Sequence, residues 1–159
     1  MIDLERALRH LAWGDDWLFA RLGEYPEEAL GATYAPEAWP VGRLAFHIVQ
    51  GAEWYAYCLT GRPWTDLPRA TSHEALAQLR ASLASLDALL LEQAALPDGT
   101  VEFEDEDGMG TALRSTILTQ AYLHSIEHRA QIACALEASG YPRLDLDSID
   151  LWAFERAGV

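Results

Sequence analysis

The chain has 159 residues, half of them hydrophobic, and includes six tryptophans and six tyrosines. This length and composition favour one domain spanning residues 1–159 with a proper core, and they exclude a disordered chain. The formal charge of −14, from 25 acidic and 11 basic residues, disfavours nucleic acid and anionic lipid as partners because both are themselves negatively charged.

The first residues and the two cysteines predict where the protein resides. Residues 1–6 lack the basic stretch and long apolar run of a signal peptide, and no stretch approaches the roughly 20 apolar residues that a membrane helix needs. Cys58 and Cys134 lie far apart in helical contexts, so we expect reduced thiols that are buried as small hydrophobic side chains. These features predict a cytoplasmic protein without a membrane partner.

A first helix is predicted over residues 2–22, because leucines recur there at helical spacing. The stripe consists of Leu4, Leu8, Leu11, Leu18 and Leu22. Asp15 interrupts this stripe and Asp16 follows it. An acid on an apolar face lies at a helix end or at a cavity, or else the helix has a register other than the predicted one. For Asp15 and Asp16 we favour structural or solvent-exposed roles over functional ones. His10 is interpreted as an ordinary residue of this helix.

Prolines and glycines in residues 25–41 exclude a regular helix there, and a second helix is predicted over residues 41–59. Its apolar face consists of Leu44, Ile48, Gly51, Ala52 and Tyr55. His47 lies on that face, where an imidazole is costly unless a partner pairs with it. Taken alone, His47 is better interpreted as a core histidine that is hydrogen-bonded to a neighbour than as a ligand. Glu53 is expected to be solvated.

A third helix is predicted over residues 72–95, with Thr71 as its cap and Glu74 at its third position, the arrangement of a capping box. Its leucines recur at helical spacing and its composition has high helix propensity. They are Leu76, Leu79, Leu83, Leu86 and Leu90. His73 is expected to be an exposed residue of the first turn, and the helix is interpreted as scaffold.

Residues 100–104 alternate polar and apolar side chains, as a short strand does, and residues 105–110 form a predicted turn. Together they predict a small hairpin-like insert before the fourth helix. The acidic run from Glu102 to Asp107 lacks the spacing of an EF-hand loop, so we interpret it as a solvated turn rather than a calcium site.

The fourth helix is predicted over residues 111–139, and Gly140 and Pro142 stop it. The tail, residues 144–156, predicts a short fifth helix that packs onto the other helices or onto a second subunit. The predicted fold class is therefore all-α, a four-helix bundle with a short fifth helix at its C-terminus.

His124 and His128 lie four residues apart on the apolar face of the fourth helix, close enough for their rings to converge on one ion. Such a pair is common by chance, so on its own it is weakly specific for metal binding. His47 provides a third ring if the second and fourth helices are neighbours, because ligand sites in bundles are built from inward-facing side chains. The adjacency of those two helices is the central structural hypothesis.

The stretches 39–48 (WPVGRLAFHI) and 124–132 (HSIEHRAQI) resemble the DinB/YfiT-like superfamily, and the similarity extends over nearly the whole chain. The resemblance implies an up-down-down-up four-helix bundle and a divalent metal held by His47, His124 and His128. It also implies that dimers are frequent. Members with an assigned activity are typically transferases that use a low-molecular-weight thiol such as bacillithiol or mycothiol, or related isomerases and hydrolases. Ala130 departs from the glycine that the family often has there, and we expect a slightly different helix packing from this change.

Three neutral imidazoles leave coordination positions open on an ion such as zinc or nickel, which is the arrangement of a catalytic rather than a structural site. A bound thiol or water would become a nucleophile near neutral pH. The expected function is thiol-dependent S-transfer to a small electrophilic substrate. The side chains that could orient the imidazoles or act beside them are Asp15, Asp16, Gln50, Glu127 and Gln131.

Three other interpretations remain. His124 to His128 matches the H-x-x-E-H pattern of inverzincin proteases, with Glu127 as general base, which would make the protein a metal-dependent hydrolase. Alternatively, the protein is a metal- or ligand-binding module without turnover. The last interpretation is a plain helical bundle with three buried histidines.

Overall fold

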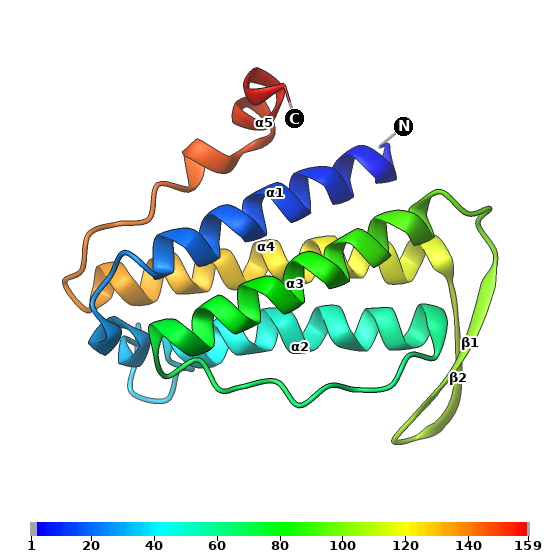
Figure 1. Cartoon of the computed structure of the whole chain (residues 1–159), viewed down its shortest axis with the longest axis horizontal. Coiled ribbons are helices and arrows are strands. Elements are labelled where there is room, and N and C mark those ends of the chain that lie inside the picture. Colours follow the sequence, from blue (N-terminus) through cyan, green and yellow to red (C-terminus); the bar gives the residue numbers. More distant parts are fainter. Residues whose placement is uncertain (1–2, 159) are drawn as a thin grey trace.

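The computed structural model describes residues 3–158, which form five α-helices, two short 3-10 helices and one two-stranded antiparallel hairpin (Figure 1). In chain order the elements are α1 (Leu4–Leu22), η1 (Glu27–Gly31), α2 (Val41–Thr60), α3 (His73–Ala94), β1 (Thr100–Asp105), β2 (Gly108–Leu113), α4 (Arg114–Ala138), η2 (Leu146–Ile149) and α5 (Leu151–Ala157).

Short polar side chains and glycines set several helix ends. The Asp3 carboxylate accepts a hydrogen bond from the backbone N–H of Arg6 and so caps α1. Gly61 caps the C-terminal end of α2 with a left-handed φ of 67°, a conformation that glycine adopts without steric cost. The predicted cap of α3 was wrong by one residue: Ser72, not Thr71, accepts from the backbone N–H of Ala75.

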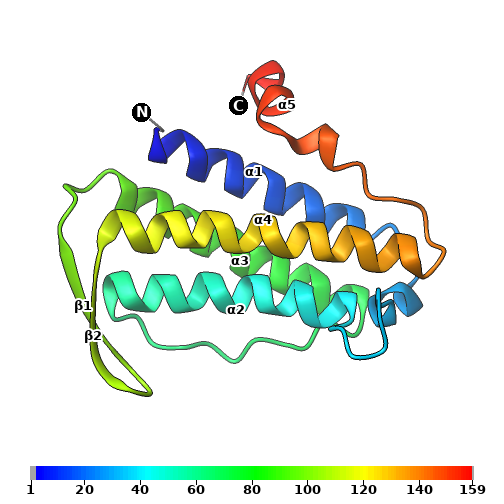
Figure 2. The ribbon, with the colours of Figure 1, turned by 180° about the vertical axis from the view of Figure 1, so that it is seen from behind.

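The four long helices lie side by side (Figures 1 and 2), with α1 packed on α3 and α4, and α2 packed on α3 and α4. α2 and α3 end near the hairpin, whereas α4 begins there and α1 begins on that same side of the molecule. The predicted stripes point inward: nearly all of their residues are buried, and Leu4 alone among them is partly exposed. The core therefore lies between these helices, and α2 and α4 are neighbours as the metal hypothesis requires.

The hairpin is longer than predicted. Residues 108–113 form a second strand paired with β1, so the turn contains only Glu106 and Asp107, and α4 begins at Arg114 rather than at Thr111. Two glycines and a weak polar–apolar alternation hide this strand in the sequence, and its pairing with β1 is what forms it.

The C-terminal segment packs on α1. This agrees with the first of the two predicted arrangements, in which the segment packs onto the other helices of the same chain. Ile149 and Phe154 are buried there, and His10 of α1 lies 2.7 Å through Nε2 from the carbonyl of Ile149. His10 is 4% exposed, so its interpretation as an ordinary helix residue was wrong. Its contact with the C-terminal segment is tertiary, and no local pattern on α1 reports it.

Two further expectations need correction. Glu53 is not solvated: it is 3% exposed and accepts a 2.8 Å hydrogen bond from the backbone N–H of Thr65. Both cysteines are free thiols, but Cys134 is exposed and only Cys58 is buried. Among residues 3–158, no helix combines the length and apolar character that crossing a membrane requires.

Candidate metal centre

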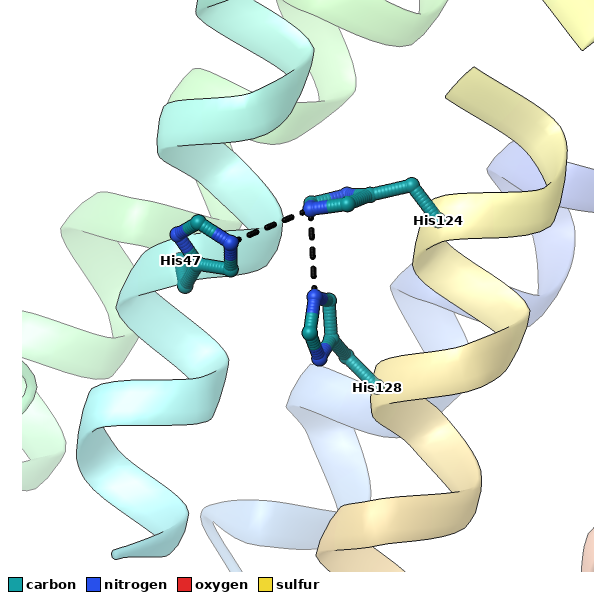
Figure 3. A group of neighbouring side chains, drawn as sticks. All are labelled: His47, His124 and His128. Carbon is teal, nitrogen blue, oxygen red and sulfur yellow. Dashed lines mark hydrogen bonds between the residues drawn. The ribbon is translucent and has the colours of Figure 1, made fainter. Parts of the chain in front are cut away.

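The three predicted histidines meet between α2 and α4 (Figure 3). His47 comes from α2, whereas His124 and His128 come from successive turns of α4. Their side chains point toward one another across the gap between the two helices. The structure therefore brings the His47 ring to two rings that lie 77 or more residues further along the chain, as predicted.

A glycine makes room for one of these rings. Gly51 lies one turn after His47 on α2, and a Cβ added there would lie 2.8 Å from Nδ1 of His124 and closer still to Cε1. Ordinary contacts at a Cβ fall between 3.4 and 4 Å. Only glycine at this position therefore leaves the His124 ring where it stands.

The ring nitrogens converge. Nε2 of His124 lies 3.2 Å from Nε2 of His47 and 3.1 Å from Nε2 of His128. One nitrogen from each ring lies within 4.8 Å of the others. These are the only three histidine, cysteine or carboxylate side chains so grouped in residues 3–158.

This spacing fits a metal ion. Nitrogens bound at about 2.0–2.1 Å to one tetrahedral zinc ion lie about 3.3–3.4 Å apart. Two of the three separations, 3.2 and 3.1 Å, are close to this value, and the third is within 4.8 Å. The donor set also fits, because imidazole nitrogen is a preferred ligand of zinc and nickel. The group could therefore hold a divalent ion with small movements of the rings.

A glutamine sets the tautomer of one ring. Nδ1 of His128 lies 2.7 Å from Oε1 of Gln131, an acceptor, so this nitrogen carries the proton and donates it. Nε2 of His128 then faces the other rings with a free lone pair. Metal-binding histidines are commonly oriented by an acceptor in this way.

Burial keeps two of the three rings, those of His124 and His47, neutral. It lowers the pKa of His124 to about 4, and the neighbouring His128 and His47 lower that pKa further in the same direction. Burial also lowers the pKa of His47, as do His128 and Arg43, while the side chain of Gln50 opposes them. Both rings are therefore neutral near pH 7, which is the form that binds metal.

Two aromatic side chains pack against the histidine cluster, one on His47 and one on His124. Trp39 packs edge-on against His47, with ring centroids 4.9 Å apart, and the guanidinium of Arg43 lies 4.0 Å from the centroid of Trp39. Tyr55 packs edge-on against His124 at 5.7 Å. These contacts hold two of the three rings from outside the nitrogen cluster.

Two of the predicted orienting acids lie elsewhere. Asp15 is 1% exposed and faces the opposite side of α4, where it accepts hydrogen bonds from Ser125 and Arg129. Asp16 is exposed and pairs with Arg80 of α3. Both acids make these contacts instead of hydrogen bonds to the three rings.

Glu127, the general base of the protease interpretation, is exposed on α4. Within residues 3–158 it makes no hydrogen bond to the three histidine rings and is not part of their cluster.

The buried pair of Asp15 and Arg129 fixes how α4 is turned. Nε and Nη2 of Arg129 donate to Oδ1 of Asp15 at 3.0 and 2.8 Å, and Nη2 also donates to the carbonyl of Leu11. Arg129 and Ser125 each follow a cluster histidine, so holding them against α1 directs His124 and His128 toward α2. The acid that interrupts the leucine stripe was the signal of this pair, because a buried acid requires a buried partner.

The sequence of the chain is similar to that of a known protein family. A model described as the DinB family matches residues 1–156. No curated protein matches the chain.

Proposed function

The chain belongs to the DinB family, and from that premise we propose a divalent-metal-dependent enzyme that transfers a low-molecular-weight thiol to small electrophilic molecules. In this proposal His47, His124 and His128 hold the metal, with zinc or nickel as the ion. Bacillithiol or mycothiol is the proposed class of thiol. The observation that carries the proposal is the convergence of three ring nitrogens between α2 and α4, two of them on rings that burial keeps neutral.

The number of protein ligands supports a catalytic site. Three rings form the only such group in residues 3–158, so no fourth histidine, cysteine or carboxylate there completes the shell. Catalytic zinc sites have three protein ligands and an open position, whereas structural sites are closed by four. When bound, a divalent ion lowers the pKa of a thiol or water that it binds and so supplies a nucleophile near neutral pH.

The chain's own residues orient the site. Gln131 holds the proton on Nδ1 of His128, and Gln50 interacts with His47. Trp39 and Tyr55 exclude water from the outer sides of His47 and His124. Among residues 3–158 no cysteine belongs to the cluster, and Ser125, next to His124, donates its hydroxyl to Asp15, so the proposal assigns the nucleophile to the second substrate.

We also propose an up-down-down-up bundle for the four long helices, within one domain spanning residues 1–159. The shared direction of α2 and α3 and the opposite direction of α1 and α4 support this topology (Figures 1 and 2). A homodimer and a cytoplasmic location complete the proposal. The two free thiols support that location, because a reducing compartment keeps cysteines unpaired.

The test has two stages. Zinc and nickel contents are measured for the protein and for His47→Ala and His124→Ala, with His73→Ala as control because His73 is exposed on α3. Each cluster variant is expected to lose the metal, and the control is expected to keep it. Metal retained by both cluster variants would refute the site.

The metal-loaded protein is then assayed for loss of free thiol with 1-chloro-2,4-dinitrobenzene. The thiols to be tested are bacillithiol, mycothiol, glutathione, coenzyme A and cysteine. We expect turnover with at least one of them, which His124→Ala abolishes. Inactivity with all of them, at full metal content, would replace the proposal by a metal-binding module without turnover.

A further inference from the structure

A hollow lies where the hairpin meets the end of α2. It has a volume of about 720 Å³ and is lined by Trp54, Tyr57, Trp64 and the acidic residues 104–107. Ligand pockets commonly have volumes of about 300–1,000 Å³. It shares no residue with the histidine cluster, and Trp54 lies seven residues, or about 10 Å, along α2 from His47.

Three aromatic rings form one platform in this hollow. The ring planes of Trp54 and Trp64 lie 16° apart, and that of Tyr57 lies 27° from Trp54 and 24° from Trp64. The three centroids are 5.7 to 6.2 Å apart, too close for a ligand to enter between the rings. Phe103 of β1 supports Trp54 edge-on at 5.8 Å. A ligand would therefore meet the platform from its open side.

The buried acid Glu53 holds the segment that carries Trp64 in place. Glu53 of α2 accepts hydrogen bonds from both the backbone N–H and the hydroxyl of Thr65. Thr65 adjoins Trp64, so this anchor fixes the segment after α2 against the helix. Trp64 nevertheless remains 51% exposed, which core packing alone does not require.

The opposite wall of the hollow is negative. Glu104, Asp105, Glu106 and Asp107 are all exposed, and no basic residue lines the hollow. None of the ion pairs formed within residues 3–158 includes any of these four acids. The charge of Asp105 also acts on a buried group of α2. Burial is the main cause that raises the pKa of the Cys58 thiol, and the negative charge of Asp105 raises it further.

We propose that this hollow binds a small organic cation that carries a quaternary ammonium group. Ring faces attract such cations through their quadrupole, and carboxylates nearby supply the compensating charge. The acidic wall of this hollow disfavours a second copy of the chain as its occupant, because two such walls would face each other in a symmetric contact. The proposal is independent of the metal centre and of the reaction proposed for it.

Choline chloride serves as the probe, and 3,3-dimethylbutan-1-ol is its neutral counterpart of the same shape. Binding is followed in ¹H–¹⁵N spectra of the six tryptophan indoles at low ionic strength. We expect saturable choline shifts in two indole signals, those of Trp54 and Trp64, with a dissociation constant on the order of 1 mM. The neutral probe is expected to bind at least about threefold more weakly.

Variants locate the site. Trp64→Ala is expected to weaken choline binding about two- to thirtyfold, and Trp64→Phe is expected to recover part of the loss. Trp152→Ala, at a side chain 73% exposed on α5, is the matched control and is expected to change nothing. Glu104→Gln/Glu106→Gln/Asp107→Asn is expected to weaken binding.

An acid variant of equal charge elsewhere, Glu28→Gln/Glu37→Gln/Glu137→Gln, is expected to leave choline binding unchanged. Circular dichroism of each variant checks that its helices are intact. Equal affinity for the neutral probe, no saturable shifts up to about 20 mM choline, or unchanged binding in Trp64→Ala would overturn the proposal. A dimer in sedimentation velocity that Trp64→Ala dissociates would overturn it too, because the platform would then be an interface between copies of the chain.

Discussion

Replacing Gly51 by alanine is expected to weaken metal binding while the helices stay folded. The new Cβ would lie 2.8 Å from Nδ1 of His124 and closer to Cε1. Unbonded heavy atoms prefer about 3.5–4.0 Å, so the His124 ring must move by roughly 1 Å. Metal–nitrogen bonds are only about 2.0–2.1 Å long, and a displacement of that size removes the ring from the set of ligands.

The expected loss in zinc affinity is at least about tenfold and extends to about a hundredfold, the range seen when the positioning of a metal ligand is disturbed. The stability of the metal-free protein should change little. Alanine favours a helix by about 1 kcal/mol over glycine, and overpacking costs about 1–3 kcal/mol. These two effects oppose each other.

The assay is a competition titration of zinc against a chelator of known affinity, with urea unfolding of the metal-free protein measured in parallel. Gly31→Ala is the matched control, because nothing lies within 4 Å of a Cβ added there and its φ is not positive. Zinc affinity unchanged in Gly51→Ala, with the fold intact, would show that the position of His124 seen here is not the one that binds metal.

Two predictions concern the buried charges. Arg129→Met leaves Asp15 buried without its cation and is expected to lower the free energy of unfolding by about 3–5 kcal/mol. Arg80→Met breaks the exposed pair with Asp16 and is expected to cost under about 1 kcal/mol; similar losses in urea unfolding would contradict this ranking. Burial, and then the charge of Asp15, raise the pKa of Asp87 well above its usual value, and its Oδ1 has no hydrogen-bond partner. The folded state therefore holds the proton of the Asp87 carboxyl more tightly than the unfolded state does. The contribution of this protonated carboxyl to the free energy of unfolding is complete below pH 3.8 and is lost as the pH rises through the raised pKa. Asp87→Asn should then be more stable than the original protein at pH 8, by a margin that shrinks toward pH 4, and a margin independent of pH would contradict the explanation.

The long helices were predictable because each carries its own signal. Leucines at helical spacing mark the inward faces of α1 and α3, and Gly61 and Gly140 stand just beyond the ends of α2 and α4. Such signals are local, so one sequence suffices to find them. The second strand of the hairpin carries no comparable signal, because its pairing with β1 stabilises it.

The histidine cluster was predictable in part. The spacing of His124 and His128 is a local feature, and His47 lies on the apolar face of its helix. That the two helices are neighbours required the resemblance to a family, since spacing along a chain does not fix which helices touch. The geometry then confirmed that adjacency.

Burial of single polar groups was the weakest part of the prediction. His10 and Glu53 each look like surface residues on their own helix, and each is buried by a partner distant in sequence or in a loop. Gln131, which was predicted as one of the side chains that could orient an imidazole, lies 2.7 Å through Oε1 from Nδ1 of His128, and this contact follows from helix spacing. Partners within one helix can be predicted from spacing, whereas partners across elements depend on packing.

The central claim is that one metal ion binds between α2 and α4. A crystal grown with zinc and measured on both sides of the zinc absorption edge tests it directly. We expect one anomalous peak per chain, about 2.0–2.1 Å from a ring nitrogen of each of His47, His124 and His128. A peak elsewhere, or one that His47 does not reach, would contradict the account.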